Sequence, residues 1–276
     1  MKKFWKKTSL FLVTAAMTVS APLMAWALEH DIVILHTNIG FAGLAQIKKD
    51  ALARTPNVAL VDAGDAIQGA PIGKLSRGLA VVDIMNYLGY DFCIPGNHEF
   101  DYGMDRFLEL VPLQRAGYYC ANFVYAGNNK QVLPGYKIMQ YEDTKVAFVG
   151  ASTPESLTTS TPAFFQNEKG KYIYSFCEDK TGNKLYKQLQ KNVDKARKDG
   201  ADYVFIVGHL GMDGTTPQWS SESVAKNTQG VDAVIDGHSH ERFTRMVKNK
   251  VGKDVLLAQT GTKLKTVGEL GITPNG

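Results

Sequence analysis

The sequence predicts an α/β layered domain, and three observations support this fold class. Short β-rich runs alternate with helical patterns along the 276-residue chain, which is typical of sheets covered by helices. Four short glycine-containing motifs each follow directly after an apolar strand. The length suits one large domain or two small ones, and no repeat or low-complexity tract marks a second domain.

The first 27 residues predict a secretory signal peptide. A basic head of four lysines precedes a short apolar run at residues 10–19, and Ala25-Trp26-Ala27 fits a small-x-small cleavage site. A membrane anchor is the alternative, but a span needs about 20 apolar residues. We therefore expect cleavage after Ala27, export to the periplasm or the exterior, and a mature catalytic domain over residues 28–276 without a stable membrane span.

Removal of this leader changes the charge of the chain. The whole chain has 31 Lys and Arg against 27 Asp and Glu, a net charge of +4. The leader contains four lysines and no acidic residue, so the mature chain has 27 of each. A neutral mature chain gives no reason to expect binding to a nucleic-acid polymer or a membrane surface. The sequence leaves the oligomeric state open.

The predicted elements begin at residue 32. Strands are expected at residues 32–35, 58–61, 92–94, 136–140, 145–149, 203–207, 231–235 and 255–259. Helices are expected at residues 42–54, 81–88, 104–114 and 184–198, where apolar residues recur at helical spacing. Pro95-Gly96 ends a strand, and residues 152–170, rich in Ser, Thr and Pro, predict a long surface loop.

The three cysteines, Cys93, Cys120 and Cys177, have no metal-type spacing. Cys93 lies in an apolar strand-like run, so we expect a buried thiol there. One disulfide is compatible with an oxidising compartment, and the pairing stays open.

The first two motifs carry oxygen ligands. In GDAIQG at residues 64–69, the carboxylate of Asp65 on a tight turn can bridge two cations, although a turn Asp can also cap a helix. In GNHEFD at residues 96–101, the amide oxygen of Asn97 can bind a metal while His98 points at a substrate. Asp101 is close enough to orient His98, with a helix N-cap as its structural alternative.

The other two motifs carry histidines. GHLG at residues 208–211 contains His209, and GHSH at residues 237–240 contains His238 and His240, whose spacing can serve two neighbouring metals. A lone histidine at a strand end is more often structural. Four of the six histidines nevertheless fall in such turns, which favours a shared role.

These candidate ligands are oxygens and nitrogens without thiolates, a set that suits Zn, Mn, Co or Fe better than Ca. Two such ions about 3.5–4 Å apart can clamp a phosphoryl group and generate a hydroxide nucleophile. The chain contains neither a G-x-S-x-G nor a P-loop motif, which excludes the commonest serine hydrolase and nucleotide-triphosphatase chemistry.

With the strand that ends His36-Thr37-Asn38, the four motifs make the chain resemble the calcineurin-like metallophosphoesterases, in particular the bacterial exported 5′-nucleotidase and UDP-sugar hydrolase group. The resemblance extends from His30 to about Leu270. It implies a four-layer α/β sandwich with two central sheets flanked by helices. It also implies metal-dependent hydrolysis of phosphate esters, with nucleotides or nucleotide sugars as small-molecule partners.

The resemblance assigns roles to individual residues. Asp65 would bridge two divalent metal ions, one completed by Asn97, His209 and His238 and the other bound by His240. His98, held by Asp101, would stabilise the transition state and protonate the leaving oxygen. No residue is assigned to substrate binding.

One departure from the family pattern affects the metal site. The family has an Asp-x-His pair directly after the first strand, and both residues bind the first metal. Here Asn38 is followed by Ile39-Gly40-Phe41-Ala42-Gly43, as if the loop were deleted. One ion then keeps four protein ligands and the other only Asp65 and His240, too few to hold it well. His36 is expected to be structural, and His30 and Asp31 precede the strand.

A second departure is the lack of the nucleoside-binding domain that 5′-nucleotidases carry after the catalytic domain. Either the substrate-binding half is missing, or the sequence is a fragment of a longer product. Two functions therefore stay open: a metal-dependent phosphoesterase, or a catalytically impaired remnant that binds one metal and phosphate without turnover.

Overall fold

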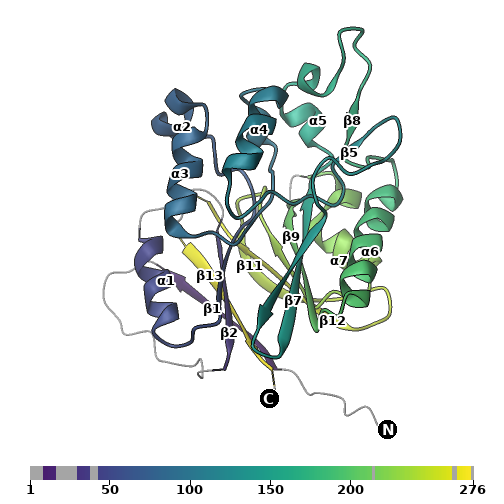
Figure 1. Cartoon of the computed structure of the whole chain (residues 1–276). Coiled ribbons are helices and arrows are strands. Elements are labelled where there is room, and N and C mark those ends of the chain that lie inside the picture. Colours follow the sequence, from purple (N-terminus) through teal and green to yellow (C-terminus); the bar gives the residue numbers. More distant parts are fainter. Residues whose placement is uncertain (1–8, 17–29, 38–42, 213–214, 263–265, 275–276) are drawn as a thin grey trace.

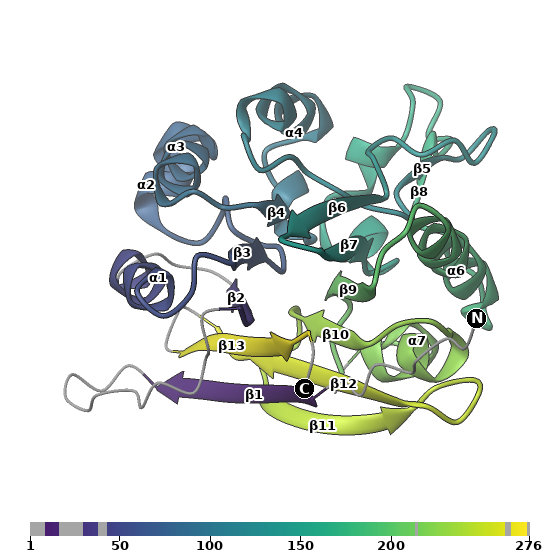
Figure 2. The ribbon, with the colours of Figure 1, turned by 60° about the horizontal axis from the view of Figure 1, so that its bottom comes forward.

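The computed structural model describes residues 9–16, 30–37, 43–212, 215–262 and 266–274. Two mixed sheets pack face to face, with helices on both outer sides (Figures 1 and 2). The structure is therefore the four-layer α/β sandwich with two central sheets that the resemblance implied.

The first sheet has the strand order β1-β13-β2-β3-β4. Its strands are β1 (Ser9–Ala16), β2 (Ile32–Thr37), β3 (Val58–Asp62), β4 (Phe92–Cys93) and β13 (Thr266–Thr273). β2, β3 and β4 pair in parallel, so their carboxyl ends lie at one edge of the sheet. β13, last in sequence, pairs antiparallel with β2 on one side and β1 on the other.

The second sheet has the order β11-β12-β10-β9-β7-β6. Its strands are β6 (Tyr136–Tyr141), β7 (Thr144–Ser152), β9 (Tyr203–His209), β10 (Ala233–Asp236), β11 (Arg242–Lys248) and β12 (Asp254–Thr260). β7, β9, β10 and β12 are parallel, and the two edge strands are antiparallel. A separate two-stranded sheet pairs β5 (Val124–Tyr125) with β8 (Tyr174–Ser175).

The helices lie outside the two sheets, as Figure 2 shows. The longer ones are α1 (Leu44–Leu52), α2 (Pro71–Ser76), α3 (Leu79–Leu88), α4 (Met104–Leu110), α6 (Asn183–Lys198) and α7 (Ser221–Asn227). Shorter turns are α5 (Ser156–Thr159) and the 3₁₀ helices η1 (His98–Phe100), η2 (Val111–Leu113), η3 (Pro162–Phe165) and η4 (Pro217–Trp219). None of the helices in the described residues is long and apolar enough to cross a membrane.

Three hydrophobic clusters hold these layers together. One, which includes Ile34, Phe148 and Ile235, fills the space between the two sheets. The other two pack the helices against the outer faces, with Phe107 of α4 in one and Leu189 of α6 in the other. Each fully buried side chain of this size stabilises the fold by roughly 1.5–3 kcal/mol. Because many such side chains pack between and around the sheets, the sheets form a rigid base for the loops at their ends.

Several predicted elements differ in detail from the structure. The helix expected at residues 104–114 ends at Leu110 and continues as η2, where Pro112 cannot donate the backbone hydrogen bond that an α-helix requires. The loop expected at residues 152–170 contains α5 and η3. β13 was not predicted, because two glycines interrupt its strand-like pattern.

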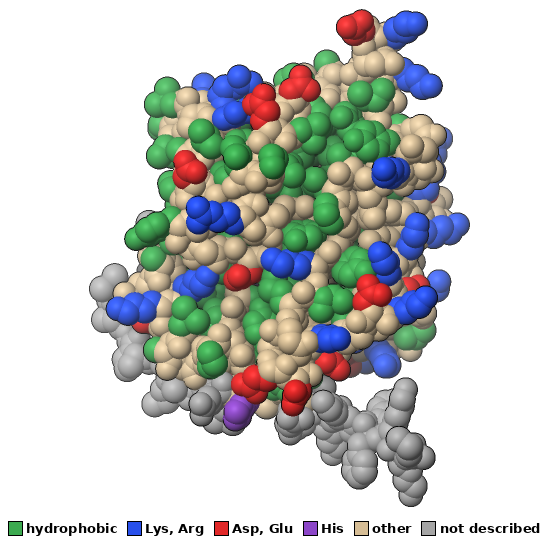
Figure 3. Space-filling model, in the orientation of Figure 1, with side chains coloured by type: hydrophobic (Ala, Val, Ile, Leu, Met, Phe, Trp, Pro, Cys, Tyr) green, Lys and Arg blue, Asp and Glu red, His purple; other side chains and the backbone are tan. Residues whose placement is uncertain are grey.

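Figure 3 shows acidic and basic side chains interspersed on one face.

The predicted leader is only partly described. Its residues 9–16 form β1 along β13, and its other residues lie outside the described ones, so cleavage after Ala27 stays a prediction. Cys93, Cys120 and Cys177 are all buried and unpaired, so the buried thiol expected at Cys93 is confirmed.

Candidate metal centre

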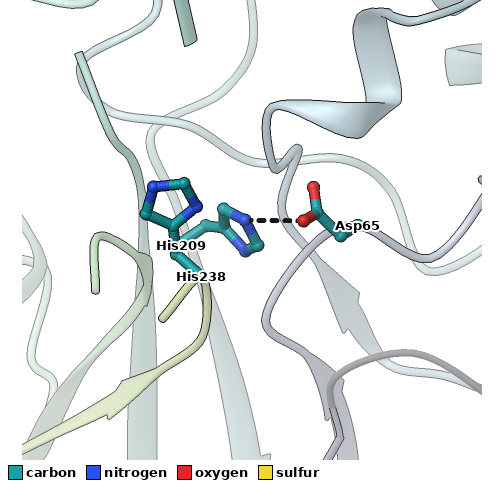
Figure 4. Close-up of side chains that lie close together, drawn as sticks. All are labelled: Asp65, His209 and His238. Atoms are coloured by element: carbon teal, nitrogen blue, oxygen red, sulfur yellow. Dashed lines mark ion pairs between the residues drawn. The ribbon is translucent and has the colours of Figure 1, made fainter. Parts of the chain in front are cut away.

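The four motifs meet at the carboxyl ends of four parallel strands. Asp65 follows β3, Asn97 follows β4, His209 is the last residue of β9, and His238 follows β10. Since β3 and β4 belong to one sheet and β9 and β10 to the other, the site lies where the two sheets end together. Figure 4 shows His209 between His238 and Asp65. Ligands bind at such strand ends in α/β proteins.

Three of the predicted ligands have an unusual backbone. Asp65, His238 and His240 have φ values of 65°, 78° and 59°, in the left-handed region that residues with a side chain rarely adopt. Such a conformation costs about 1–3 kcal/mol per residue and persists only where surrounding contacts enforce it. Three of the seven described non-glycine residues with positive φ are predicted ligands, which favours a functional constraint on these turns.

Glu99 enforces the turn at Asp65. Its fully buried carboxylate accepts hydrogen bonds from the backbone N–H groups of Asp65 (2.7 Å), Ala66 (2.7 Å), Ile67 (3.2 Å) and Gly96 (2.5 Å). Burial, followed by the charge of Asp65, raises the pKa of Glu99 to about 7. Glu99 therefore ties the first motif to the second.

Three acceptor atoms converge beside this turn. His209 Nε2 lies 3.0 Å from Asp65 Oδ2 and 3.2 Å from Asn97 Oδ1. His209 Nδ1 is 2.7 Å from the carbonyl oxygen of Ala63, so Nδ1 carries a proton and Nε2 of the neutral ring has a lone pair. Three lone pairs facing one another require a proton or a cation among them. This arrangement fits a metal ion.

The pKa values of Asp65 and His209 agree with this geometry. Burial acts to raise the pKa of Asp65, but the charge of His209 and its hydrogen bond outweigh burial and lower that pKa to about 2. Burial acts to lower the pKa of His209, but Asp65 outweighs it and raises that pKa to about 9. A proton on His209 therefore occupies the place that a cation would take.

His238 completes the group, whereas His240 stays at its margin. Asp65, His209 and His238 each offer a ligand atom within 4.8 Å of the others. His238 Nε2 also lies 3.2 Å from Glu155 Oε2. The hydrogen bond from His238 is the main cause that lowers the pKa of Glu155 to about 2. The exposed His240 is not part of this group in the described structure.

His98 and Asp101 form a second pair beside the first. His98 Nδ1 lies 2.6 Å from Asp101 Oδ2, and His98 N–H donates to Asp65 Oδ1 at 2.8 Å. The hydrogen bond to Asp101 raises the pKa of His98. Phe100, which lies between His98 and Asp101 in the sequence, is fully buried. Its ring packs edge-on against Phe107, with 4.9 Å between the ring centroids. This aromatic anchor fixes the turn while His98 stays 39% exposed.

His36 does not join the site. It is fully buried, and neither ring nitrogen has a hydrogen-bond partner in the described structure. Burial alone lowers its pKa to about 4. Residues 38–42, where the family pattern places an Asp-x-His pair that this sequence lacks, lie outside the described residues. His30 pairs with Glu142 at 3.0 Å, away from the candidate ligands.

Three carboxylates that shape the site were not predicted from the sequence. Glu99 was part of a motif but received no role. Asp236, at the end of β10, accepts hydrogen bonds from the N–H groups of Leu210 and Gly211 and so ties the third motif to the fourth. Glu155 lies 83 residues before His238, in a segment that predicted only a surface loop. No local signal marks Glu155, because its partner is distant in sequence.

Comparisons with known proteins agree with the fold and the motifs. The family model for calcineurin-like phosphoesterases matches residues 31–242. Snake venom 5′-nucleotidase of Gloydius brevicauda is 26% identical over 95% of this chain and 48% of its own length. Human 5′-nucleotidase is 29% identical over 82% of this chain and 41% of its own. The chain thus spans less than half the length of these curated relatives.

Two solved structures are also similar. The 5′-nucleotidase precursor of Thermus thermophilus superposes with a TM-score of 0.72 at 25% identity, over 88% of this chain and 51% of that one. The calcineurin-like phosphoesterase YfkN of Bacillus subtilis superposes with a TM-score of 0.71 at 22% identity. The match covers 87% of this chain and 84% of that one, and it shows the shared fold. The chain belongs to the calcineurin-like phosphoesterase family and is related to its 5′-nucleotidases.

Proposed function

We propose that this protein hydrolyses phosphate esters, with 5′-nucleotides as its preferred substrates, by means of divalent metal ions. The observation that carries this proposal is the convergence of Asp65 Oδ2, Asn97 Oδ1 and His209 Nε2 on one point beside the His98–Asp101 pair. The family matched by the chain is a family of metal-dependent phosphoesterases.

Asp65, Asn97, His209 and His238 would hold one ion, and Asp65 with His240 would hold a second. This set of oxygen and nitrogen ligands suits Zn, Mn, Co or Fe. Bound ions would supply Lewis acidity towards the phosphoryl oxygens and a nucleophile at neutral pH.

His98 would act as the general acid of the reaction. Its Nδ1–H donates to Asp101, which fixes the ring and keeps its Nε2 protonated to higher pH. From a 39% exposed position it can reach a substrate and pass the Nε2 proton to the leaving oxygen. Asp101 holds the ring in place and stabilises its cationic form.

The choice of nucleotides rests on the relatives. Those most similar in sequence include proteins named 5′-nucleotidase and 2′,3′-cyclic-nucleotide 2′-phosphodiesterase/3′-nucleotidase. Nucleotide sugars are a second substrate class of the same chemistry. The predicted leader and the venom relatives support action outside the cytoplasm, in the periplasm or the extracellular space, where such an enzyme would recover nucleosides and phosphate.

One observation favours a second candidate function. Asn38 is followed by five residues without Asp or His, so the second ion lacks the two ligands that the family pattern places there. Two remaining protein ligands hold a divalent ion poorly. On this account the protein is a remnant that binds one metal and phosphate without turnover.

Turnover separates the two functions. The full chain, processed by the expressing cell, would be assayed with AMP and with an aryl phosphate in the presence of Mn²⁺ or Co²⁺. Phosphate release that is lost in His98→Asn, while bound metal is retained, supports the enzyme. Metal binding without phosphate release in the parent protein supports the remnant.

A further inference from the structure

Glu155 contacts the Nε2 atom of His238 and lies outside the group of candidate ligands. It lies just after β7, at the start of α5, and its Oε2 is 3.2 Å from His238 Nε2. Its other oxygen, Oε1, accepts two hydrogen bonds of 2.6 Å from Thr216, one from the backbone N–H and one from the hydroxyl. The side chains of Glu155 and His238 are only 15% and 14% exposed. Glu155 is therefore fixed at both oxygens.

These contacts determine which nitrogen of His238 carries the proton. A carboxylate only accepts hydrogen bonds, so the short contact to Oε2 requires a proton on Nε2. The neutral ring then has its lone pair on Nδ1, the single atom left that can bind a cation. In His209 the roles of the two ring nitrogens are reversed. Its Nδ1–H donates to the Ala63 carbonyl, which leaves Nε2 free for the ion.

We propose that Glu155 is a positioning residue of the metal centre, which fixes the Nε2–H tautomer of His238 and so presents Nδ1 to the ion. This inference rests on the proposed function, since it assumes that a metal binds at this site. We assign Glu155 a role beside the ligands, because it lies outside the group of Asp65, His209 and His238 and both of its oxygens already accept hydrogen bonds. Partners of this kind orient metal-binding histidines and raise their basicity.

The substitution Glu155→Gln tests this role sharply. The N–H of Thr216 is a fixed donor, so the amide oxygen of the new side chain must stay at that position. The NH₂ group then faces His238 Nε2 as a donor, which favours the Nδ1–H tautomer and removes the lone pair from the metal-binding atom. The opposite amide orientation would place NH₂ against the Thr216 N–H.

The measurements are the Kd for Co²⁺ and the histidine tautomers in the ion-free protein, from ¹⁵N NMR with ¹⁵N-labelled histidine. We expect His238 in the Nε2–H form in the parent and the Nδ1–H form in Glu155→Gln. The Kd should rise about 10- to 100-fold in that variant and at least as much as in Glu155→Ala. Glu178→Gln is the matched control, because Glu178 also accepts from a hydroxyl and a backbone N–H but contacts no histidine. Its Kd should be unchanged.

The outcomes distinguish the inference from the function on which it rests. A parent protein that binds no Co²⁺ contradicts the proposed function, and the metal role of Glu155 with it. A parent that binds Co²⁺, with an unchanged Kd in Glu155→Gln, contradicts the role of Glu155 alone. An Nδ1–H tautomer of His238 in the ion-free parent overturns the inference without any variant.

Discussion

At the scale of single residues, the site depends on buried acceptors that face fixed backbone donors. The two oxygens of Glu99 accept four N–H groups, and Asp236 accepts two more from the third motif. These contacts hold Asp65 in a left-handed conformation that it would otherwise avoid. The candidate ligands are therefore positioned by carboxylates that would not themselves touch the ion.

Glu99→Gln should destabilise the protein although the two side chains have the same shape. The new NH₂ group would face two backbone N–H donors, leaving buried groups unsatisfied at about 1–3 kcal/mol each. Urea unfolding at pH 8, where Glu99 is mostly ionised, should show that the free energy of unfolding falls by at least about 2 kcal/mol. Glu109→Gln, at an exposed position on α4, is the control and should change stability by less than about 0.5 kcal/mol. Equal stability of both variants would contradict the role of Glu99.

His36 should make the fold sensitive to acid. Its folded pKa of about 4 lies below the unfolded value of 6.5, so the unfolded chain binds the extra proton between these pH values. The neutral ring of His36 therefore contributes fully to the free energy of unfolding above pH 6.5. This contribution declines as the pH falls towards 4, by about 3 kcal/mol in total. We expect His36→Leu to lose stability less steeply than the parent over this range in urea unfolding at a series of pH values. Parallel curves would show that His36 is already charged or solvated.

At the scale of elements, the loops after β3 and β4 fit together without room for a side chain. A Cβ added to Gly96 would lie 2.2 Å from Asp65 Oδ1 and 2.7 Å from Asp65 N. The GDAIQG and GNHEFD turns are thus one packed unit, closed by Glu99 and anchored in the core by Phe100.

Gly96→Ala should therefore displace the carboxylate of Asp65 and weaken metal binding by at least about tenfold, because a misplaced ligand loses its bond to the ion. Isothermal titration with Mn²⁺ measures the effect. Gly127→Ala is the matched control, since an added Cβ there meets nothing within 4 Å. Parent-like affinity in Gly96→Ala would mean that Asp65 is not held by this contact.

At the scale of the whole molecule, the sequence predicted the layers and the positions of the candidate ligands because their signals are local. Apolar strands that end in glycine turns place Asp65, Asn97, His209 and His238 at one edge, as the structure confirms. Other features depend on partners distant in sequence. Glu155 meets a histidine 83 residues away, and β13 inserts beside β2 from the far end of the chain. No pattern in a single segment contains that information.

The five residues after Asn38, which contain no Asp or His, lead to a prediction at this scale. Inserting a family-type Asp-x-His loop there should add two ligands and allow a second ion to bind beside the first. Native mass spectrometry over a series of Mn²⁺ concentrations should then show the second ion bound at lower concentration than in the parent protein, where only Asp65 and His240 would hold it. An inserted loop of the same length with Asn and Gln in place of Asp and His is the control, and an equal ion count for both at every concentration would contradict the prediction.

The most direct test is the number of bound ions in the parent protein, Asp65→Asn and Asp83→Asn, measured by native mass spectrometry with Mn²⁺. Asp83 is an exposed residue on α3 and serves as the control. We expect at least one ion in the parent and in Asp83→Asn, and none in Asp65→Asn, because the carboxylate of Asp65 is the charge shared by the candidate ligands. Ion binding that persists in Asp65→Asn, or is absent from the parent, would contradict this account.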